Sequence, residues 1–184
     1  MRHAGTKELE TERLRLRRFT VQDAPAMYAN WANDAEVTRW MRWEPHQSAA
    51  ETQDILRQWQ ASYDQPDYYH WAIVRKADGV LMGSIGILPG QEADDAGLFS
   101  PGYCIGRAFW GQGYTTEALQ AVMDYFLHET DIEHLVCCHA AQNPASGRVM
   151  EKAGFVFHHD GVYHKQDGTA VAARHYHFNK QETE

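Results

Sequence analysis

One stretch of the sequence decides the fold: Gly102-Tyr-Cys-Ile-Gly-Arg-Ala-Phe-Trp-Gly-Gln-Gly-Tyr-Thr-Thr-Glu-Ala-Leu119. A predicted strand ends in it, a glycine-rich loop follows, and a helix is predicted from Gln112 to about Glu129. Gly111 and Gly113 let the backbone turn sharply and approach a ligand closely. The first N–H groups of a helix have no internal partner and lie at the positive end of its dipole. The loop from Trp110 to Thr116 is therefore predicted to bind an anion.

This loop differs from the two commoner phosphate-binding loops. It lacks the Gly-Lys-Ser/Thr ending of a P-loop and the three-glycine spacing of the dinucleotide fingerprint. No acidic side chain lies between Arg107 and Thr116 to oppose a phosphate. Taken alone, however, the stretch fits an ordinary helix start with a glycine turn equally well.

A second marked segment, Asn143-Pro-Ala-Ser-Gly-Arg-Val-Met-Glu-Lys-Ala-Gly-Phe155, predicts another helix. Asn143 is a good N-cap, Pro144 suits the first helical position, and Gly154 suits the C-terminal cap. These features explain the helix without any function. Asn143 and Ser146 are also polar groups at the start of a helix that follows a strand, where ligands often bind.

Together the two segments resemble the GNAT superfamily of acetyl-CoA-dependent N-acetyltransferases, especially its RimJ/RimL-type branch of ribosomal-protein N-terminal acetyltransferases. The opening Thr11-Glu-Arg-Leu-Arg-Leu-Arg17 resembles the first strand of that branch. The resemblance covers about Thr11 to Phe178. It implies an α+β (mixed α/β) GNAT-like fold, with a central mixed, mostly antiparallel seven-stranded sheet and helices on both faces.

The resemblance also implies how acetyl-CoA is bound as co-substrate. The backbone of the Gly-Tyr strand would pair with the pantetheine arm like an added strand, and the loop amides would hold the pyrophosphate. Asn143 would hydrogen-bond the pantetheine arm, and Ser146 stands where such enzymes protonate the departing thiolate. The expected cofactor-binding residues are Tyr103, Cys104, Ile105, Gly111, Gln112, Gly113, Tyr114, Thr115, Thr116, Asn143 and Ser146.

On the catalytic side the sequence departs from the family pattern. Many relatives carry a carboxylate two residues before the glycine that opens the Gly-Tyr strand, and this chain has Ser100 there. The sequence therefore leaves the general base open, either to a water chain or to one of several side chains. These are Glu92, Asp94, Asp95 and His70. Ser146 is the expected general acid, and Tyr163 is the alternative, because tyrosine serves this role in other branches of the family.

The expected binding site for the acceptor amine includes an aromatic cluster between two predicted helices. Trp40 and Trp43 either pack in the core or line the acceptor pocket, which Ser100 would also reach. Periodicity and turn residues predict the remaining elements. Strands are expected over 13–17, 68–74, 80–88, 102–106, 133–140, 155–158 and 170–178, and further helices over 20–31, from Ser48, and over 143–153.

The length and composition of the chain indicate its number of domains and its cellular location. The chain has 184 residues, which suits one domain over 1–184, with 1–9 and 180–184 as loose tails. No apolar run approaches the ~20 residues of a bilayer span, so no membrane association is expected. The polar start lacks a signal peptide, and Cys104, Cys137 and Cys138 form no disulfide framework. A cytoplasmic protein, monomeric or homodimeric, is predicted.

The net charge and the histidine content of the chain bear on whether it binds nucleic acid or a metal ion. The formal charge of −8 argues against general affinity for nucleic acid, which needs a basic surface. Several histidines crowd the C-terminal third, but no cysteine or carboxylate spacing accompanies them, so no metal site is expected. These histidines are His158, His159, His164, His175 and His177.

The predicted function is acetyl transfer from acetyl-CoA directly to a primary amine of a protein N-terminus or a small molecule. The alternative is a GNAT-fold module that binds acetyl-CoA without transferring the acetyl group, which Ser100 in place of a carboxylate would explain. A plain interaction domain would require both glycine-containing segments to be accidental.

Overall fold

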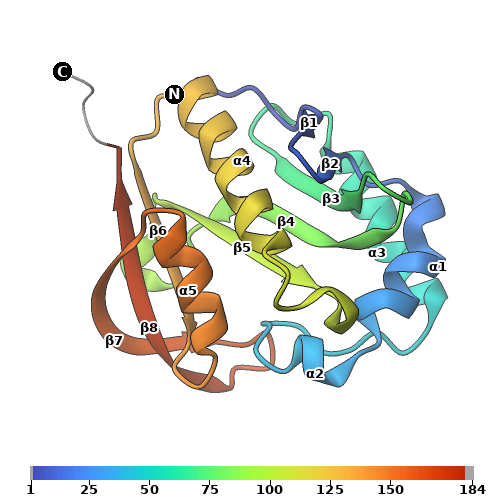
Figure 1. The fold of residues 1–184 in the computed structure, drawn as a ribbon. Coiled ribbons are helices and arrows are strands. Elements are labelled where there is room, and N and C mark those ends of the chain that lie inside the picture. The colour runs from blue at the N-terminus through green and yellow to red at the C-terminus, as the bar shows by residue number, and fades with distance from the viewer. Residues whose placement is uncertain (1, 181–184) are drawn as a thin grey trace.

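The sheet of the computed structural model, which describes residues 2–180, has eight strands in the order β1-β2-β3-β4-β5-β6-β8-β7 (Figure 1). The strands are Leu9–Glu10 (β1), Leu14–Arg17 (β2), Tyr69–Arg75 (β3), Leu81–Pro89 (β4), Phe99–Ile105 (β5), His134–Ala140 (β6), Val156–His164 (β7) and Ala170–Asn179 (β8). Neighbouring strands are antiparallel except β5 and β6, which are parallel. The mixed, mostly antiparallel sheet is confirmed, with β1 as one strand more than the seven expected.

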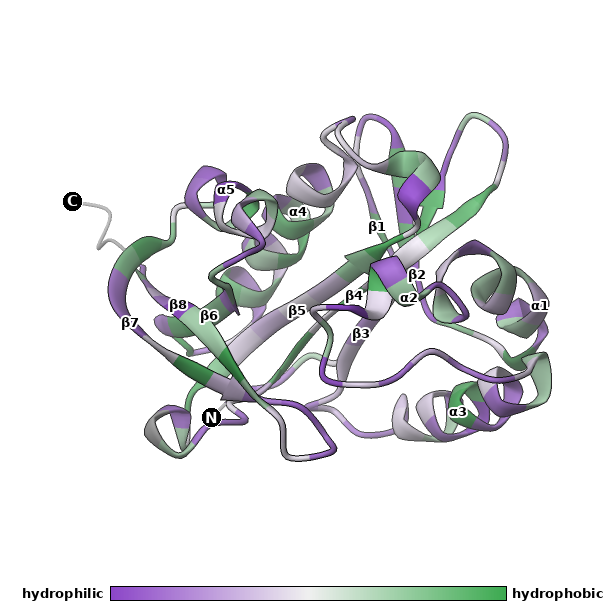
Figure 2. Cartoon of the chain, turned by 90° about the horizontal axis from the view of Figure 1, so that it is seen from below, coloured by the Kyte–Doolittle hydropathy of each residue, from purple (hydrophilic) through white to green (hydrophobic). Residues whose placement is uncertain are grey.

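Helices cover both faces of this sheet, as predicted. They are Ala24–Met27 (α1), Ala35–Thr38 (α2), Ala49–Ser62 (α3), Tyr114–Glu129 (α4) and Pro144–Lys152 (α5). From below, strands β2–β5 lie between α4 and α5 on one side and α1 and α3 on the other (Figure 2). Leu119, Val122 and Phe126 of α4 join one core cluster, and Leu56 of α3 joins a second. No helix within residues 2–180 is long and apolar enough to cross a membrane.

The helix expected over 20–31 is divided into three short pieces. A 3-10 turn at Val21–Asp23 leads into α1, and a π-helical turn follows at Tyr28–Ala32. Pro25 fits the first turn of α1 but carries no N–H to continue a preceding helix. The sequence predicted the start and the end of this helical segment, but it did not show these breaks.

The first residues pack on the sheet, although a loose tail was expected over 1–9. Thr6 is buried and its Oγ1 donates to the carbonyl of Tyr68 at 2.8 Å. The Tyr125 hydroxyl of α4 donates to the carbonyl of Gly5 at 2.7 Å. The segment is held by backbone groups and polar side chains, so its polar composition gave no sign of this packing. Of the other expected tail, 181–184 lie outside the described residues.

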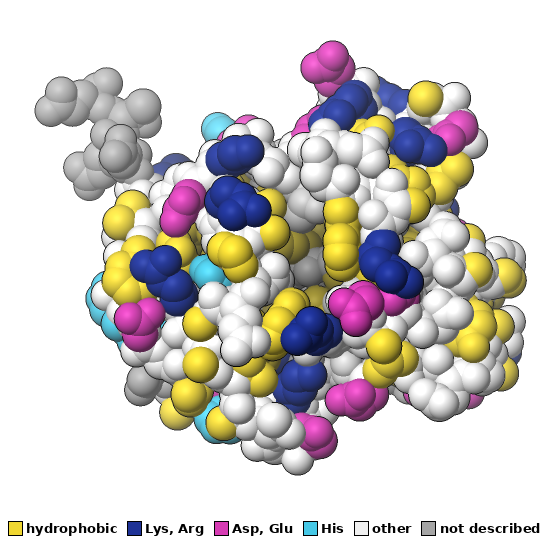
Figure 3. All heavy atoms as spheres, turned by 60° about the horizontal axis from the view of Figure 1, so that its bottom comes forward, with side chains coloured by type: hydrophobic (Ala, Val, Ile, Leu, Met, Phe, Trp, Pro, Cys, Tyr) yellow, Lys and Arg dark blue, Asp and Glu magenta, His cyan; other side chains and the backbone are white. Residues whose placement is uncertain are grey.

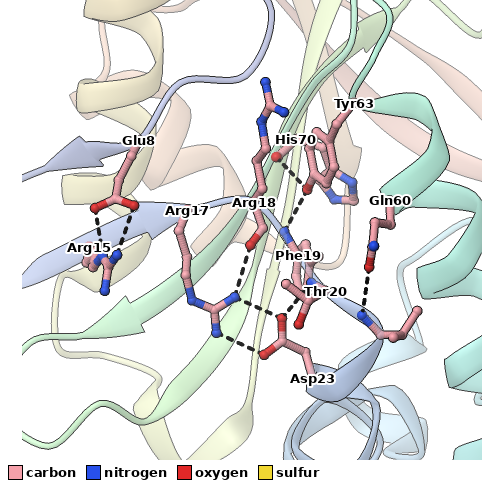
Figure 4. Close-up of polar contacts among 11 residues, drawn as sticks. Glu8, Arg15, Arg17, Arg18, Phe19, Thr20, Asp23, Gln60, Tyr63 and His70 are labelled. Carbon is pink, nitrogen blue, oxygen red and sulfur yellow. Dashed lines mark hydrogen bonds and ion pairs between the residues drawn. The ribbon is translucent and has the colours of Figure 1, made fainter.

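The arginines of the first full strand are paired with carboxylates on neighbouring segments (Figure 4). Arg15 binds Glu8 through Nε at 2.7 Å, and Arg17 binds Asp23 through Nη1 at 2.8 Å. The hydroxyl of Tyr63, the C-cap of α3, links the segment that follows β2 to β3. It accepts from the N–H of Phe19 at 2.8 Å and donates to the carbonyl of His70 at 3.0 Å. The contacts of Asp23 and Tyr63 hold the start of α1 and the end of α3 close to β2 and β3.

Acid is expected to destabilise the protein through His70. Its ring lies between the Tyr68 hydroxyl at 3.0 Å and Ser84 Oγ at 2.6 Å, and burial lowers its pKa to about 3. The unfolded chain, with a pKa near 6.5, therefore binds more protons, and stability falls as pH drops from about 6.5 towards 3. For His70 alone the loss between pH 7 and pH 5 is about 2 kcal/mol.

Urea unfolding at the two pH values checks this expectation. The drop in unfolding free energy should be about 2 kcal/mol smaller in His70→Gln than in the wild type. His46, His139 and His177, whose pKa values are also lowered by burial, contribute equally to both proteins and cancel. Equal pH dependence in the two proteins would contradict the role of His70.

Candidate active site

The two parallel strands separate along their length. β5 and β6 pair at one position, Phe99 with Leu135. Beyond it β5 stays bonded to β4 as far as Ile105, and β6 stays bonded to β8 as far as Ala140. Figure 1 shows the two strands diverging below α4 and α5. The facing edges of β5 and β6 therefore have backbone groups that no neighbouring strand of the described sheet uses.

Helix α4 begins where β5 ends. Gly111 and Gly113 have φ values of 72° and 81°, a region that glycine adopts without strain. Gly113 is the N-cap, so the helix begins at Tyr114, two residues later than predicted. Within residues 2–180, no group accepts a hydrogen bond from the amides of 112–116. These amides, at the positive end of a 16-residue helix, are suited to bind an anion.

Helix α5 begins at the other side of the separation, and its N-cap differs from the prediction. The side chain of Asn143 makes no capping hydrogen bond to α5. Its backbone, with φ −116° and ψ 69°, differs from the extended N-cap that was expected. The helix begins instead with Pro144, whose missing N–H needs no cap. The side-chain amide of Asn143 is therefore available to bind another partner.

A tyrosine of β5 reaches across to the first turn of α5. The Tyr103 hydroxyl lies 3.0 Å from Ser146 Oγ and donates to the Ser146 carbonyl at 3.1 Å. Burial raises the pKa of Tyr103 above its usual range, so the phenol keeps its proton at neutral pH. The structure thus brings Tyr103, Asn143 and Ser146 together. The sequence assigned only a backbone role to Tyr103, and its partner lies 43 residues away, beyond any local signal.

The next two residues of β5 point to opposite faces of the sheet. Cys104 packs beside the cluster under α1 and α3, whereas Ile105 belongs to the cluster under α4. Burial raises the pKa of the Cys104 thiol to about 12, so it stays protonated and is a poor nucleophile at neutral pH. The carbonyl of Ile105 accepts from the Trp110 indole at 2.8 Å, which fixes the end of β5 next to the glycine loop.

The alternative acid lies on the other face of β6. The buried Tyr163 of β7 donates its hydroxyl to the carbonyl of Trp40 at 2.7 Å, and both pack with Cys138. Trp43 instead packs beside the cluster of α1 and α3, with its ring 5.3 Å from that of His46. The structure therefore brings Trp40 and Tyr163 together but separates Trp43 from them.

Comparison with known proteins shows to which family this chain belongs. The model of the acetyltransferase (GNAT) domain matches residues 13–156. The chain belongs to the GNAT acetyltransferase family. The uncharacterized N-acetyltransferase YoaA of Bacillus subtilis (strain 168) is 32% identical over 165 residues, which cover 88% of this chain and 90% of YoaA.

Solved structures share the GNAT fold of this chain. One is RimL, a ribosomal L7/L12 alpha-N-protein acetyltransferase in complex with coenzyme A. It has 20% identity and a TM-score of 0.75, over 95% of this chain and 98% of RimL. Another is the ribosomal-protein-S5-alanine acetyltransferase from Vibrio fischeri, with 17% identity and a TM-score of 0.73, over 97% and 99% of the two chains. At these identities the likeness concerns the fold alone.

In this GNAT acetyltransferase two of the candidate bases are weak at neutral pH. Burial alone would raise the pKa of Glu92, but hydrogen bonds from His164 and Arg42 outweigh it and lower the pKa to about 2. Glu92 instead ties the connection before β5 to β7 and to the segment after α2. His70, with a pKa of about 3, is equally unsuited. The side chain of Asp94 lies outside the described structure.

The face seen from below combines apolar side chains with charged ones of both signs (Figure 3). Figure 3 shows hydrophobic side chains lining a central hollow, with both basic (Lys, Arg) and acidic (Asp, Glu) side chains around it. The apolar lining suits the uncharged arm of a ligand, whereas the charged side chains of both signs around it in Figure 3 do not by themselves select an anion.

The crowded histidines of β7 and β8 stack in pairs. His158 and His177 lie 3.9 Å apart between ring centroids, and His159 and His175 lie 4.6 Å apart. His164 is separate, since it binds Glu92. Among residues 2–180, no group of three or more His, Cys, Asp or Glu side chains is placed to hold a metal ion.

Proposed function

We propose that this GNAT acetyltransferase uses acetyl-CoA and moves the acetyl group directly to a primary amine of a protein N-terminus or a small molecule. The observation that carries the proposal is the separation of β5 from β6, with the starts of α4 and α5 on either side of it. A pyrophosphate fits the unbonded amides of 112–116, and an extended amide-containing arm fits the unpaired edge of β5.

Each candidate residue then has a defined task. Acetyl-CoA, when bound, supplies the thioester that the amine attacks and the thiolate that leaves. Gly111 to Thr116 would hold the pyrophosphate, and Asn143, whose side chain does not cap α5, would hydrogen-bond the arm. Ser146 would donate a proton to the sulfur as the carbon–sulfur bond breaks. Water would take the proton that the amine loses as the amide forms and would return one to the serine. Tyr103, 3.0 Å from Ser146 Oγ, would orient that hydroxyl.

The acceptor amine binds, in this proposal, on the side of Trp40 and Tyr163. Ser100 lies on β5 at the narrow end of the separation, opposite Leu88 of β4. Both named structural neighbours act on ribosomal proteins, and RimL is described as an alpha-N-protein acetyltransferase. Their names support a protein α-amine as the first class of acceptor to examine.

Release of coenzyme A, followed with a thiol reagent over a panel of N-terminal peptides and small amines, tests this function. Transfer to at least one primary amine is expected. Tight binding of acetyl-CoA with transfer to no acceptor would favour the binding-module alternative. A protein that binds no acetyl-CoA would refute both.

The rate is expected to follow the ionisation of the acceptor rather than that of an enzyme carboxylate. Glu92 and His70 have pKa values of about 2 and 3, so neither gains or loses a proton near neutrality. For a peptide α-amine, kcat/KM should rise tenfold per pH unit and level off near pH 8. An acceptor whose amine has a higher pKa should shift this plateau upward by the same amount. A change in kcat/KM near pH 6 that is the same for all acceptors would instead show that an enzyme group acts as the base.

A further inference from the structure

The turn before β2 is bonded to the first turn of α4 through one carboxylate. Glu117 accepts three hydrogen bonds: from Thr11 Oγ1 at 2.6 Å, from the Arg13 N–H at 2.9 Å and from Arg13 Nε at 2.7 Å. Burial alone would raise the pKa of Glu117, but the bonds from Thr11 and Arg13 lower it. Glu117 therefore remains ionised at neutral pH and orients the Arg13 side chain.

From this anchor the Arg13 guanidinium reaches the glycine loop. Its Nη1 donates to the carbonyl of Gln112 at 2.9 Å, and its carbon lies 4.3 Å from the centre of the Tyr114 ring. Its Nη2 lies 3.4 Å from the position that a Cβ on Gly113 would occupy. Arg13 thus contacts Gln112, Gly113 and Tyr114, the three residues at which the loop becomes a helix.

These contacts restrict the backbone of the loop at Gly113, where the loop itself restricts it least. Gly113 has no side chain to restrict its backbone, and many φ and ψ values are open to it in the absence of tertiary contacts. With the Gln112 carbonyl bonded to Arg13, the Gln112–Gly113 peptide has one orientation, and its N–H lies opposite that carbonyl. Binding of an anion then requires no ordering of this peptide, which preserves affinity.

We propose that Arg13 is a positioning residue for the pyrophosphate of the donor, which it serves by fixing the Gln112–Gly113 peptide. The inference rests on the proposed function, since it assigns the loop to acetyl-CoA. It gives the Thr11-Glu-Arg segment a role in donor binding besides its place next to β2. Thr11 and Glu117 take part indirectly, by holding the Arg13 side chain towards the loop.

The chain provides a matched control two residues further along, at Arg15 of β2. Arg15 binds Glu8 through Nε at 2.7 Å, the same distance as Arg13 to Glu117, but within residues 2–180 it makes no hydrogen bond or ion pair with the loop. If affinity for coenzyme A were lost only because an ion pair next to β2 is broken, Arg15→Ala would show the same loss. A loss that follows from the loop would appear in Arg13→Ala alone.

Calorimetric binding of coenzyme A and of pantetheine, which lacks the pyrophosphate, separates positioning from general structure. Arg13→Ala should raise the dissociation constant of coenzyme A about tenfold and leave that of pantetheine unchanged, because one charge-assisted hydrogen bond to the loop is lost. Arg15→Ala should change neither. Arg13→Lys should fall between wild type and Arg13→Ala, since it keeps the charge but loses the planar fork.

Equal losses for coenzyme A and pantetheine, or unchanged affinity for coenzyme A, would overturn the proposal. If Arg13→Ala does not fold by circular dichroism, Arg13→Lys supplies the same comparison. Wild-type protein that binds coenzyme A but transfers no acetyl group would refute the proposed function, while the affinities would still decide the role of Arg13. Wild-type protein that binds no coenzyme A would refute both.

Discussion

Gly113→Glu is expected to weaken coenzyme A binding by at least about 100-fold, or about 2.7 kcal/mol. Gly113 has a φ of 81° and is the N-cap of α4, beside the amides proposed to hold the pyrophosphate. A carboxylate introduced there places negative charge at the positive end of the helix and opposes the anion. The dissociation constant of coenzyme A, measured by calorimetry, checks this result.

Two further variants distinguish charge from backbone strain. Gly113→Gln shares the strain of a side chain at positive φ, about 1–2 kcal/mol, without the charge, so it should lower stability equally and weaken binding less. Gly79→Glu places the same charge at a φ of 72° in open space between β3 and β4. It should leave binding unchanged. Equal affinity in Gly113→Glu and wild type would refute the placement of the pyrophosphate.

The elements that the sequence predicted best are those whose pattern is local. Leu14 and Leu16 alternate with arginines, and both are fully buried. The apolar positions of α4 recur at helical spacing, and five residues at this spacing are buried. They are Ala118, Leu119, Val122, Met123 and Phe126. Ser48 caps α3 by accepting from the N–H of Glu51.

The features that the sequence could not show depend on contacts between distant segments. Separation of β5 from β6 is set by pairing with β4 and β8, which no single strand encodes. Tyr103 meets Ser146 only because β5 and α5 lie side by side, and Arg13 meets Glu117 across 104 residues. Asn143 had the residue type and position of an N-cap, but a local preference alone does not decide the orientation of its side chain.

Ser146→Ala is expected to lower kcat by about 100-fold, a typical effect of removing a general acid. The change in the dissociation constant of coenzyme A should stay below about threefold, since the hydroxyl is needed chiefly when the carbon–sulfur bond breaks. Steady-state kinetics with an acceptor from the panel, together with calorimetry, would measure both. Ser146→Thr, which keeps a hydroxyl, should retain more of the rate than Ser146→Ala.

The competing acid gives the opposite expectation. The Tyr163 hydroxyl already donates to the Trp40 carbonyl at 2.7 Å, and burial raises its pKa, so its proton is held away from a leaving thiolate. Tyr163→Phe should therefore change kcat by less than about fivefold. A loss as large as that of Ser146→Ala would assign the proton to Tyr163, and an undiminished rate in Ser146→Ala would remove the serine from the mechanism.

Tyr103 allows the role of the serine to be tested through its neighbour. If Tyr103 acts by orienting Ser146 Oγ, which lies 3.0 Å from its hydroxyl, Tyr103→Phe should lower kcat by about tenfold only while the serine is present. In the Ser146→Ala background the same change should have almost no effect, because the group that it orients has gone. Additive losses would instead mean that the two hydroxyls act separately, with Tyr103 contributing to transfer by a route other than Ser146.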